Sequence, residues 1–343
     1  MTIVVVAPNW LGDAVMALPA LADLRRHFAD ARLVVAARRS VSALFPLVPG
    51  VDGVVSLPGK GGVAALGTWR EDVAALRDAA GDVAILLPNS LASAVVALRA
   101  GIAERWGLAT DGRSRLLTRA VPRPRGHRHQ AAYYQALTTA LGVPAGPQLA
   151  RVVPPVPRDG LIPDGRYVVL APGAAYGSAK QWPVSQWAIL AALLADEGWQ
   201  IVLVGSAGDR ATCAAVRRLV PHSQQARVMD LTGETSLADL TAVLASADGV
   251  VSNDSGAMHL AAATGARVVA VFGATDETRT APVRASLDHP EAMVLTAEAW
   301  CRPCLLRECP IDHRCMTGIT AMRVAEAVRT VATRREGGRR IGA

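Results

Sequence analysis

Short apolar runs alternate along this chain with stretches of helical periodicity. In the first part, TIVVVAP, RLVVAAR and DVAILLPNS have the composition of buried strands, and helices are predicted after them at residues 13–28, 42–47 and 91–100. In the second part, RYVVLAPG, WQIVLVGS, ADGVVSND and ARVVAVFG are strand candidates, with helices predicted at 185–197 and 209–219. Strands that alternate with helices in this way indicate parallel sheets joined by crossover helices. The pattern therefore predicts an α/β protein.

A segment rich in proline and glycine, residues 143–165, separates the two series. It contains VVPPVPRDGLIPDG and has neither helical nor strand periodicity, so it is the natural linker. We predict two Rossmann-like domains, residues 1–155 and 156–343, that face each other across a cleft with ligands at the carboxyl ends of the strands. The length of 343 residues and the apolar content of 51% suit two well-cored domains.

Charge and hydropathy narrow the class of protein. The net charge of +7 fits an acidic ligand or a headgroup surface as well as nucleic acid, but no aromatic-rich platform for single strands accompanies it. No apolar stretch approaches the roughly 18 residues of a membrane span. MTIVVVAPNW has no basic segment ahead of its apolar run, and Asp13 interrupts the apolar residues after it, so we expect no signal peptide and a cytoplasmic protein.

Two motifs lie where a strand runs into a helix: APGAAYGSAKQWP at residues 171–183 and NDSGAMHLAAATG at residues 253–265. Each places small residues with free backbone N–H groups before a helix start that favours anions. Lys180 lies in the first motif. The chain has 36 basic residues of the lysine and arginine type, and only Lys60 and Lys180 are lysines. We expect the compact ammonium of Lys180 to face a nucleotide diphosphate; the alternative is a loop lysine without a partner.

Seven segments occur in an order typical of one enzyme family: PNWLGDAVMALPAL, LPNSLASAVVALRAGIAERWG, PGAAYGSAKQWP, LVGSAGD, DLTGETSLADL, SNDSGAMHLAAATG and FGATDETRTAP. From about Ile3 to about Pro282 the chain resembles glycosyltransferase family 9. The resemblance implies a GT-B fold and an inverting, metal-independent transfer of a heptose. The donor would be ADP-heptose, and the acceptor would be the lipopolysaccharide inner core at the inner face of the cytoplasmic membrane.

Asp13 lies just past the first predicted strand, where a helix begins. A carboxylate there can accept the proton of an attacking sugar hydroxyl as the anomeric bond breaks. A first-turn acid favoured by the helix dipole is the alternative. The resemblance matches Asp13 to the family's catalytic base. Lys180 and the backbone amides of Ser255 and Gly256 would offset the charge of the leaving nucleoside diphosphate.

The resemblance also implies a donor site in the second domain. Its predicted residues are Tyr176, Lys180, Asp209, Asn253, Asp254, Ser255, Gly256, His259 and Thr275. For His259 the alternative is a helix histidine satisfied by backbone carbonyls. Asp209 follows a predicted strand, where a carboxylate can accept ribose hydroxyls. Glu277 stands where the family's proline is expected, which puts the local turn in doubt.

The acceptor site is expected in the first domain, where Asn89, Ser90 and Arg105 match the family. Residues 113–128 add six arginines. Arginine binds carboxylates and phosphates in bidentate fashion, and the inner core offers both. The alternative is a solvated arm that reflects the arginine-rich composition.

Four of the five cysteines lie within fifteen residues: Cys301, Cys304, Cys309 and Cys315, with His313 nearby. In a reduced cytoplasm this spacing suggests a metal site more than disulfides. Zinc is the first hypothesis, an iron–sulfur cluster the second and free thiols the third. Because the cluster is far in sequence from Asp13, we predict a structural role, with no cofactor required for catalysis.

Three classes of function remain. A sugar transferase, acting on the inner core or on another acceptor, explains both phosphate motifs and Asp13. A nucleotide-sugar epimerase of the same architecture explains the motifs but needs further acid–base carboxylates. A nucleic-acid-binding protein accounts only for the charge and the cysteines, so we expect no nucleic-acid partner.

Overall fold

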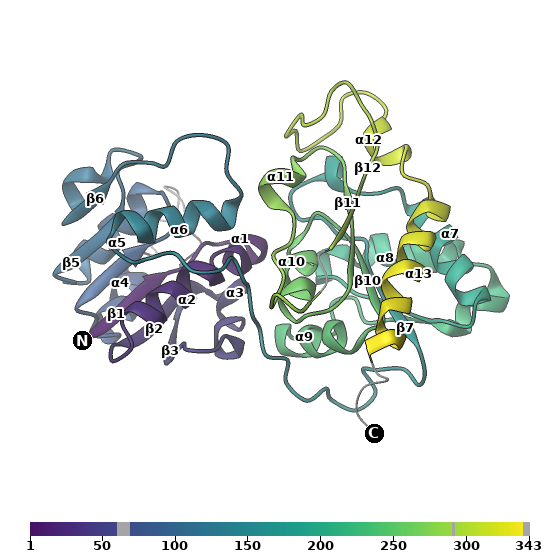
Figure 1. Cartoon of the computed structure of the whole chain (residues 1–343), viewed down its shortest axis with the longest axis horizontal. Helices are drawn as coiled ribbons and strands as arrows, with labels where there is room; N and C mark the ends of the chain where they lie inside the picture. Colours follow the sequence, from purple (N-terminus) through teal and green to yellow (C-terminus); the bar gives the residue numbers. More distant parts are fainter. Residues whose placement is uncertain (60–68, 290–291, 339–343) are drawn as a thin grey trace. The chain divides into compact units, whose positions relative to one another are not determined.

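The computed structural model describes residues 1–59, 69–289 and 292–338, with side chains described as far as Ala332, so that Lys60 lies outside the described residues. The chain forms two compact units, Met1–Val153 and Pro154–Ala343 (Figure 1). Residues 143–166, which include the predicted linker, contain neither helix nor strand.

The first unit is a six-stranded parallel sheet with helices on its faces. Its strands are β1 (Thr2–Val6), β2 (Arg32–Arg38), β3 (Gly53–Leu57), β4 (Val83–Leu86), β5 (Glu104–Leu108) and β6 (Arg119–Val121). Its helices are α1 (Leu11–Met16), α2 (Leu18–His27), α3 (Arg39–Ser42), α4 (Trp69–Asp78), α5 (Leu91–Arg99) and α6 (Gln130–Ala140). The strand order is β3-β2-β1-β4-β5-β6.

The second unit repeats this plan. Its strands are β7 (Tyr167–Ala171), β8 (Gln200–Leu203), β9 (Val228–Asp230), β10 (Gly249–Asn253), β11 (Val268–Phe272) and β12 (Met293–Thr296). Its helices are α7 (Val184–Asp196), α8 (Arg210–Leu219), α9 (Leu237–Ser246), α10 (Gly256–Ala263), α11 (Glu277–Thr280), α12 (Arg314–Thr317) and α13 (Ala321–Gly338). The strand order β12-β11-β10-β7-β8-β9 is the same topology as in the first unit.

Both sheets change winding direction at one point. This point lies between β1 and β4 in the first unit and between β7 and β10 in the second. Doubly wound sheets bind ligands beside the carboxyl ends of the strands at such a point. The α/β prediction with two Rossmann-like units is confirmed, and the loops after β1, β4, β7 and β10 are where functional side chains are expected.

Two predicted helices of the first unit are wrong in detail. The helix predicted over residues 13–28 is two helices, α1 and α2, that meet at Ala17. Pro19 lies in the first turn of α2, where its ring and its missing N–H prevent α1 from continuing. The segment 42–47 holds the end of α3 and a short 3-10 turn, Phe45–Leu47, that contains Pro46.

The core of the second unit anchors the loop after β7. Trp182 and Trp187 are fully buried and pack edge to face with ring centroids 5.0 Å apart. The indole Nε1 of Trp182 donates to the carbonyl of Ile319, just before α13, at 2.8 Å. Because Trp182 follows Lys180 by two residues, this packing holds one end of the lysine-bearing loop in place.

Candidate active site

Asn253 joins the loops that follow β7 and β10. Its side chain is fully buried; Nδ2 donates to the carbonyl of Pro172 at 2.6 Å, and Oδ1 accepts from the backbone N–H of Trp182 at 3.1 Å. A buried side-chain amide needs an acceptor for its N–H group and a donor for its oxygen, and these two loops supply both. Asn253 therefore holds the loops after β7 and β10 together, and both loops carry predicted donor-site residues.

Lys180 lies inside this junction and is paired. Its Nζ donates to Oδ2 of Asp254 at 2.6 Å, and the Thr275 hydroxyl donates to the same oxygen at 2.6 Å. The lysine side chain is 14% exposed and that of Asp254 is 5% exposed. The alternative of a lysine without a partner is therefore wrong. Three loops, after β7, β10 and β11, converge on one carboxylate.

The aromatic ring of Tyr176 covers this lysine. The Lys180 ammonium lies 4.8 Å from the ring centroid, within the range of a cation–π interaction. The Tyr176 hydroxyl donates to the carbonyl of Leu305 at 2.7 Å. Tyr176 thus links the predicted donor loop to the cysteine-rich segment, residues 301–315.

The amino end of α10 adds donors for an anion. Ser255 is the N-cap residue, but its side chain forms no capping hydrogen bond and its hydroxyl lies 3.0 Å from that of Ser252. The first-turn N–H groups, beginning at Gly256, have no partners within the helix, and the helix dipole favours negative charge there. His259 is buried one turn further on, 3% exposed.

Asp209 ends a short 3-10 turn after β8, Ala207–Asp209, and its side chain lies against the loop after β7. Its Oδ2 accepts from the Ser206 N–H at 2.8 Å and from the Ser206 hydroxyl at 2.7 Å. A Cβ on Gly173 would collide with the Asp209 carboxylate, so only glycine permits this approach. The structure brings Asp209 next to the loop that carries Lys180.

Glu277, at the position of the expected proline, begins α11 and has a specific partner. Its Oε2 accepts from Nη2 of Arg302 at 2.7 Å, and Nε of Arg302 donates to the carbonyl of Gly273 at 2.7 Å. This pair ties the loop after β11 to the cysteine-rich segment.

The cysteine-rich segment lies beside two loops that carry predicted donor-site residues. The backbone N–H of Leu305 donates to the carbonyl of Ala274 at 2.9 Å, and that of Ala179 donates to the carbonyl of Arg307 at 3.0 Å. These two bonds join the segment to the loops after β11 and β7, which carry predicted donor-site residues.

The four clustered cysteines are free thiols in this structure. Burial raises the pKa of Cys315, and the charges of Cys301, Cys304 and Cys309 raise it further. The backbone N–H of His313 donates to Sγ of Cys309 at 3.4 Å. Within the described part of the chain, however, no three His, Cys, Asp or Glu side chains converge closely enough to hold a metal ion.

In the first unit, Asp13 lies in the first turn of α1, just past β1. Helix α6 places Tyr134, which is 5% exposed, near this carboxylate. Burial raises the pKa of Tyr134, and the nearby charge of Asp13 raises it further. A buried, protonated hydroxyl therefore lies beside Asp13.

Helix α6 also contacts Asn89, a predicted acceptor-site residue. The hydroxyl of Tyr133 accepts from Nδ2 of Asn89 at 3.1 Å, in the loop after β4. Ser90 follows and caps α5 by accepting from the Ser93 N–H at 3.4 Å. Adjacent tyrosines on one helix thus lie beside α1 and contact the loop after β4.

Arg105 lies away from this edge. It is the second residue of β5, near the amino ends of the strands. Its guanidinium donates to the carbonyls of Leu116 at 2.8 Å, Ile102 at 2.6 Å and Ala103 at 2.8 Å. The structure does not bring Arg105 together with Asn89 and Ser90, and these bonds support a structural role for it.

Arg113, the first of the six arginines, is neither solvated nor exposed to a ligand. It is fully buried; Nε donates to the carbonyl of Leu108 at 2.9 Å, and Nη1 donates to the Ser93 hydroxyl at 3.0 Å and to the carbonyl of Pro88. It braces the loop that carries Asn89. Nothing in the sequence set it apart from the other five arginines.

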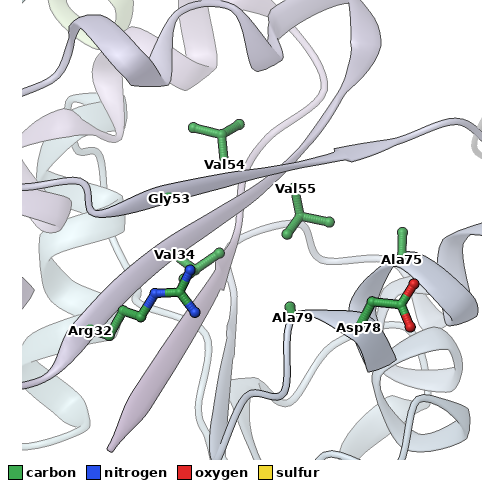
Figure 2. A pocket seen from close by; sticks show the side chains of 8 residues that line it. All are labelled: Arg32, Val34, Gly53, Val54, Val55, Ala75, Asp78 and Ala79. Atoms are coloured by element: carbon green, nitrogen blue, oxygen red, sulfur yellow. The ribbon is translucent and has the colours of Figure 1, made fainter.

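The first unit also contains a hollow of about 330 Å³ that is separate from the predicted site residues (Figure 2). It is bounded by Arg32 and Gly53 at the amino ends of β2 and β3 and by Asp78 and Ala79 at the end of α4. It contains no predicted site residue. Ligands of doubly wound sheets bind at the opposite edge, so we do not assign this hollow a part in the chemistry.

Two doubly wound, Rossmann-like units are the architecture of the GT-B class. The sequence pattern of glycosyltransferase family 9 (heptosyltransferase) matches residues 70–314. Lipopolysaccharide heptosyltransferase 2 of Escherichia coli K12 is 32% identical over 298 residues, which cover 82% of this chain and 86% of that enzyme. The chain belongs to glycosyltransferase family 9.

Further relatives agree. Lipooligosaccharide heptosyltransferase 2 of Haemophilus influenzae is 29% identical over 299 residues, with coverage of 82% of this chain and 86% of that protein. The structure of E. coli ADP-heptose lps heptosyltransferase II matches with a TM-score of 0.82 at 29% identity, covering 98% of this chain and all of the other. The resemblance predicted from the motifs is confirmed.

Proposed function

We propose that this enzyme transfers a heptose from ADP-heptose to the inner core of lipopolysaccharide in a single inverting displacement. The observation that carries the proposal is the match over 98% of the chain to the structure of E. coli ADP-heptose lps heptosyltransferase II. The site chemistry agrees with it. The comparisons favour a transferase over an epimerase.

The reaction assigns a task to each unit. Residues 1–155 bind the acceptor, and the Asp13 carboxylate takes the proton from its attacking hydroxyl as the new glycosidic bond forms. Residues 156–343 bind the nucleotide sugar. The bond between the anomeric carbon and the diphosphate oxygen breaks with its electron pair on ADP, and Lys180 and the amino end of α10 offset that charge.

The acceptor explains the charge of the protein. A net charge of +7 suits an anionic acceptor and an anionic membrane surface. Among the described helices, none combines the length and the hydropathy needed to cross a bilayer. We place the reaction at the inner face of the cytoplasmic membrane.

A donor assay tests the proposed function. ADP-heptose is incubated with the enzyme, with and without inner-core acceptor, and both ADP and the sugar are followed. We expect ADP release to depend on the acceptor. An isomerised nucleotide sugar formed without acceptor would support the epimerase instead.

Replacement of Tyr134 tests how the base is positioned. Tyr134→Phe removes the buried hydroxyl beside Asp13, and we expect kcat to fall about tenfold with ADP affinity unchanged. Tyr133→Phe removes the contact to Asn89 and should instead raise the KM of the acceptor. Equal kcat in wild type and Tyr134→Phe would show that Asp13 needs no support from α6.

We also propose that Cys301, Cys304, Cys309 and Cys315 bind a structural metal centre, with a zinc ion as the first expectation and an iron–sulfur cluster as the second. Their spacing in the sequence and the N–H that Cys309 accepts support this, and metal binding would require the thiolates to move closer together. Metal binding would then contribute directly to the stability of the second unit.

Elemental analysis tests the metal. Protein purified under reducing, anaerobic conditions should carry about one zinc equivalent, whereas brown protein with visible absorption would indicate iron and sulfur. Cys304→Ser combined with Cys309→Ser should lose the metal and melt several degrees earlier. Cys213→Ala is the matched control, because Cys213 is buried on α8 and burial raises its pKa to about 11. Wild-type protein that contains no metal would contradict the proposed metal site and support the hypothesis of free thiols.

A further inference from the structure

Residues 305–307 of the cysteine-rich segment bridge two donor loops. Leu305 donates its N–H to Ala274 after β11 and accepts from the Tyr176 hydroxyl, while the carbonyl of Arg307 accepts from Ala179 after β7. Leu305 has a φ of 57°, a conformation that its branched side chain disfavours. These bonds on both sides therefore hold a backbone geometry that the residue would not adopt by itself.

Gly177 allows this close approach. Its φ is 154°, and a Cβ at this position would collide with the carbonyl oxygen of Arg307. A glycine is therefore required where the two segments cross. The backbone of Arg307 is thus placed next to the loop that we expect to bind the diphosphate.

The side chain of Arg307 turns back to the same aromatic ring as Lys180. Its Cζ lies 5.4 Å from the Tyr176 ring centroid, and the Lys180 Nζ lies 4.8 Å from it. Arg307 is exposed, and its guanidinium forms no ion pair within the described residues. Two cations therefore lie at one tyrosine.

The two cations differ in what they can still bind. The charge of Lys180 is already balanced by Asp254 at 2.6 Å. The diphosphate of a nucleotide sugar carries about two negative charges, so a paired ammonium alone leaves it under-compensated. Arg307 has an unengaged planar fork that matches two phosphate oxygens.

We propose that Arg307 is a diphosphate-binding residue of the donor site, presented by the cysteine-rich segment and held in place by Tyr176. The inference rests on the proposed use of a nucleotide sugar and adds a binding residue that lies outside the seven family motifs. It also gives the cysteine-rich segment a part in donor binding.

Calorimetric binding of ADP and of adenosine to the full-length protein tests this role. Arg307→Gln should weaken ADP binding about tenfold and leave adenosine binding unchanged, because only ADP carries phosphates. Arg307→Lys should recover part of the loss. The difference should shrink at high salt. Arg218→Gln, which removes one exposed charge from α8 in the same unit, should keep wild-type ADP affinity.

The outcomes separate this inference from the proposed function. Equal ADP affinity of wild type and Arg307→Gln overturns the inference alone. A parallel loss of adenosine and ADP binding also overturns it, because that result assigns Arg307 to loop stability. Failure of the wild type to bind ADP would instead be a failure of the proposed function.

Discussion

Asn in place of Asp13 is expected to lower heptose transfer by roughly 10²-fold or more, the usual scale for loss of a general base. An amide keeps the size of the side chain and can still meet the Tyr134 hydroxyl, but it cannot accept the proton of the attacking oxygen. Steady-state transfer and calorimetric ADP binding should therefore separate, with turnover lost and donor affinity retained.

Asp30→Asn is the matched control for this variant. Asp30 is exposed in the turn after α2, so the change removes one carboxylate from the same unit without touching α1 or α6. We expect wild-type turnover from it. Near-normal turnover of Asp13→Asn would remove Asp13 from the mechanism.

Ala in place of Lys180 is expected to reduce transfer by about 10²- to 10³-fold, the scale for losing one group that stabilises a developing anion. ADP binding should weaken as well, because the ammonium interacts with the bound diphosphate. Lys180→Arg should recover only part of the activity, because a planar fork fits poorly in a site built for a point charge. Transfer rates and ADP affinities of the three proteins check this.

A double variant separates catalysis from structure at this position. Lys180→Ala leaves the buried Asp254 carboxylate without its cation, which by itself destabilises the loops. Lys180→Ala combined with Asp254→Ala removes both charges. If Lys180 acts on the diphosphate, the double variant stays as slow as the single one; recovery of transfer would show that Lys180 serves only to neutralise Asp254.

The central strands were predictable because each is a continuous apolar run buried on both faces. β1, β2, β4, β7, β8, β10 and β11 all carry this pattern. The edge strands were not predicted. β3 and β6 are mostly half-buried or exposed, so GVVSL and RAV lack the signal of a buried strand.

The loops of the predicted donor site could be located from the sequence because they are built from small residues between a strand and a helix. Lys180 was notable for its rarity, and the structure gives it Asp254 and Thr275 as partners. The contacts of Tyr134 and Arg307 could not be predicted, since each depends on segments more than a hundred residues apart in the chain. The adjacent tyrosines of α6, in a chain with four tyrosines, were the only signal for the first.

Mass-resolved product analysis tests the central claim most directly. The purified enzyme is incubated with ADP-heptose and a panel of inner-core acceptors truncated to different lengths, and each acceptor is weighed by mass spectrometry while ADP is quantified. The account predicts that at least one core gains the mass of one heptose, with one ADP released for each heptose added. ADP released without any gain in acceptor mass, or no turnover on any core, would contradict it.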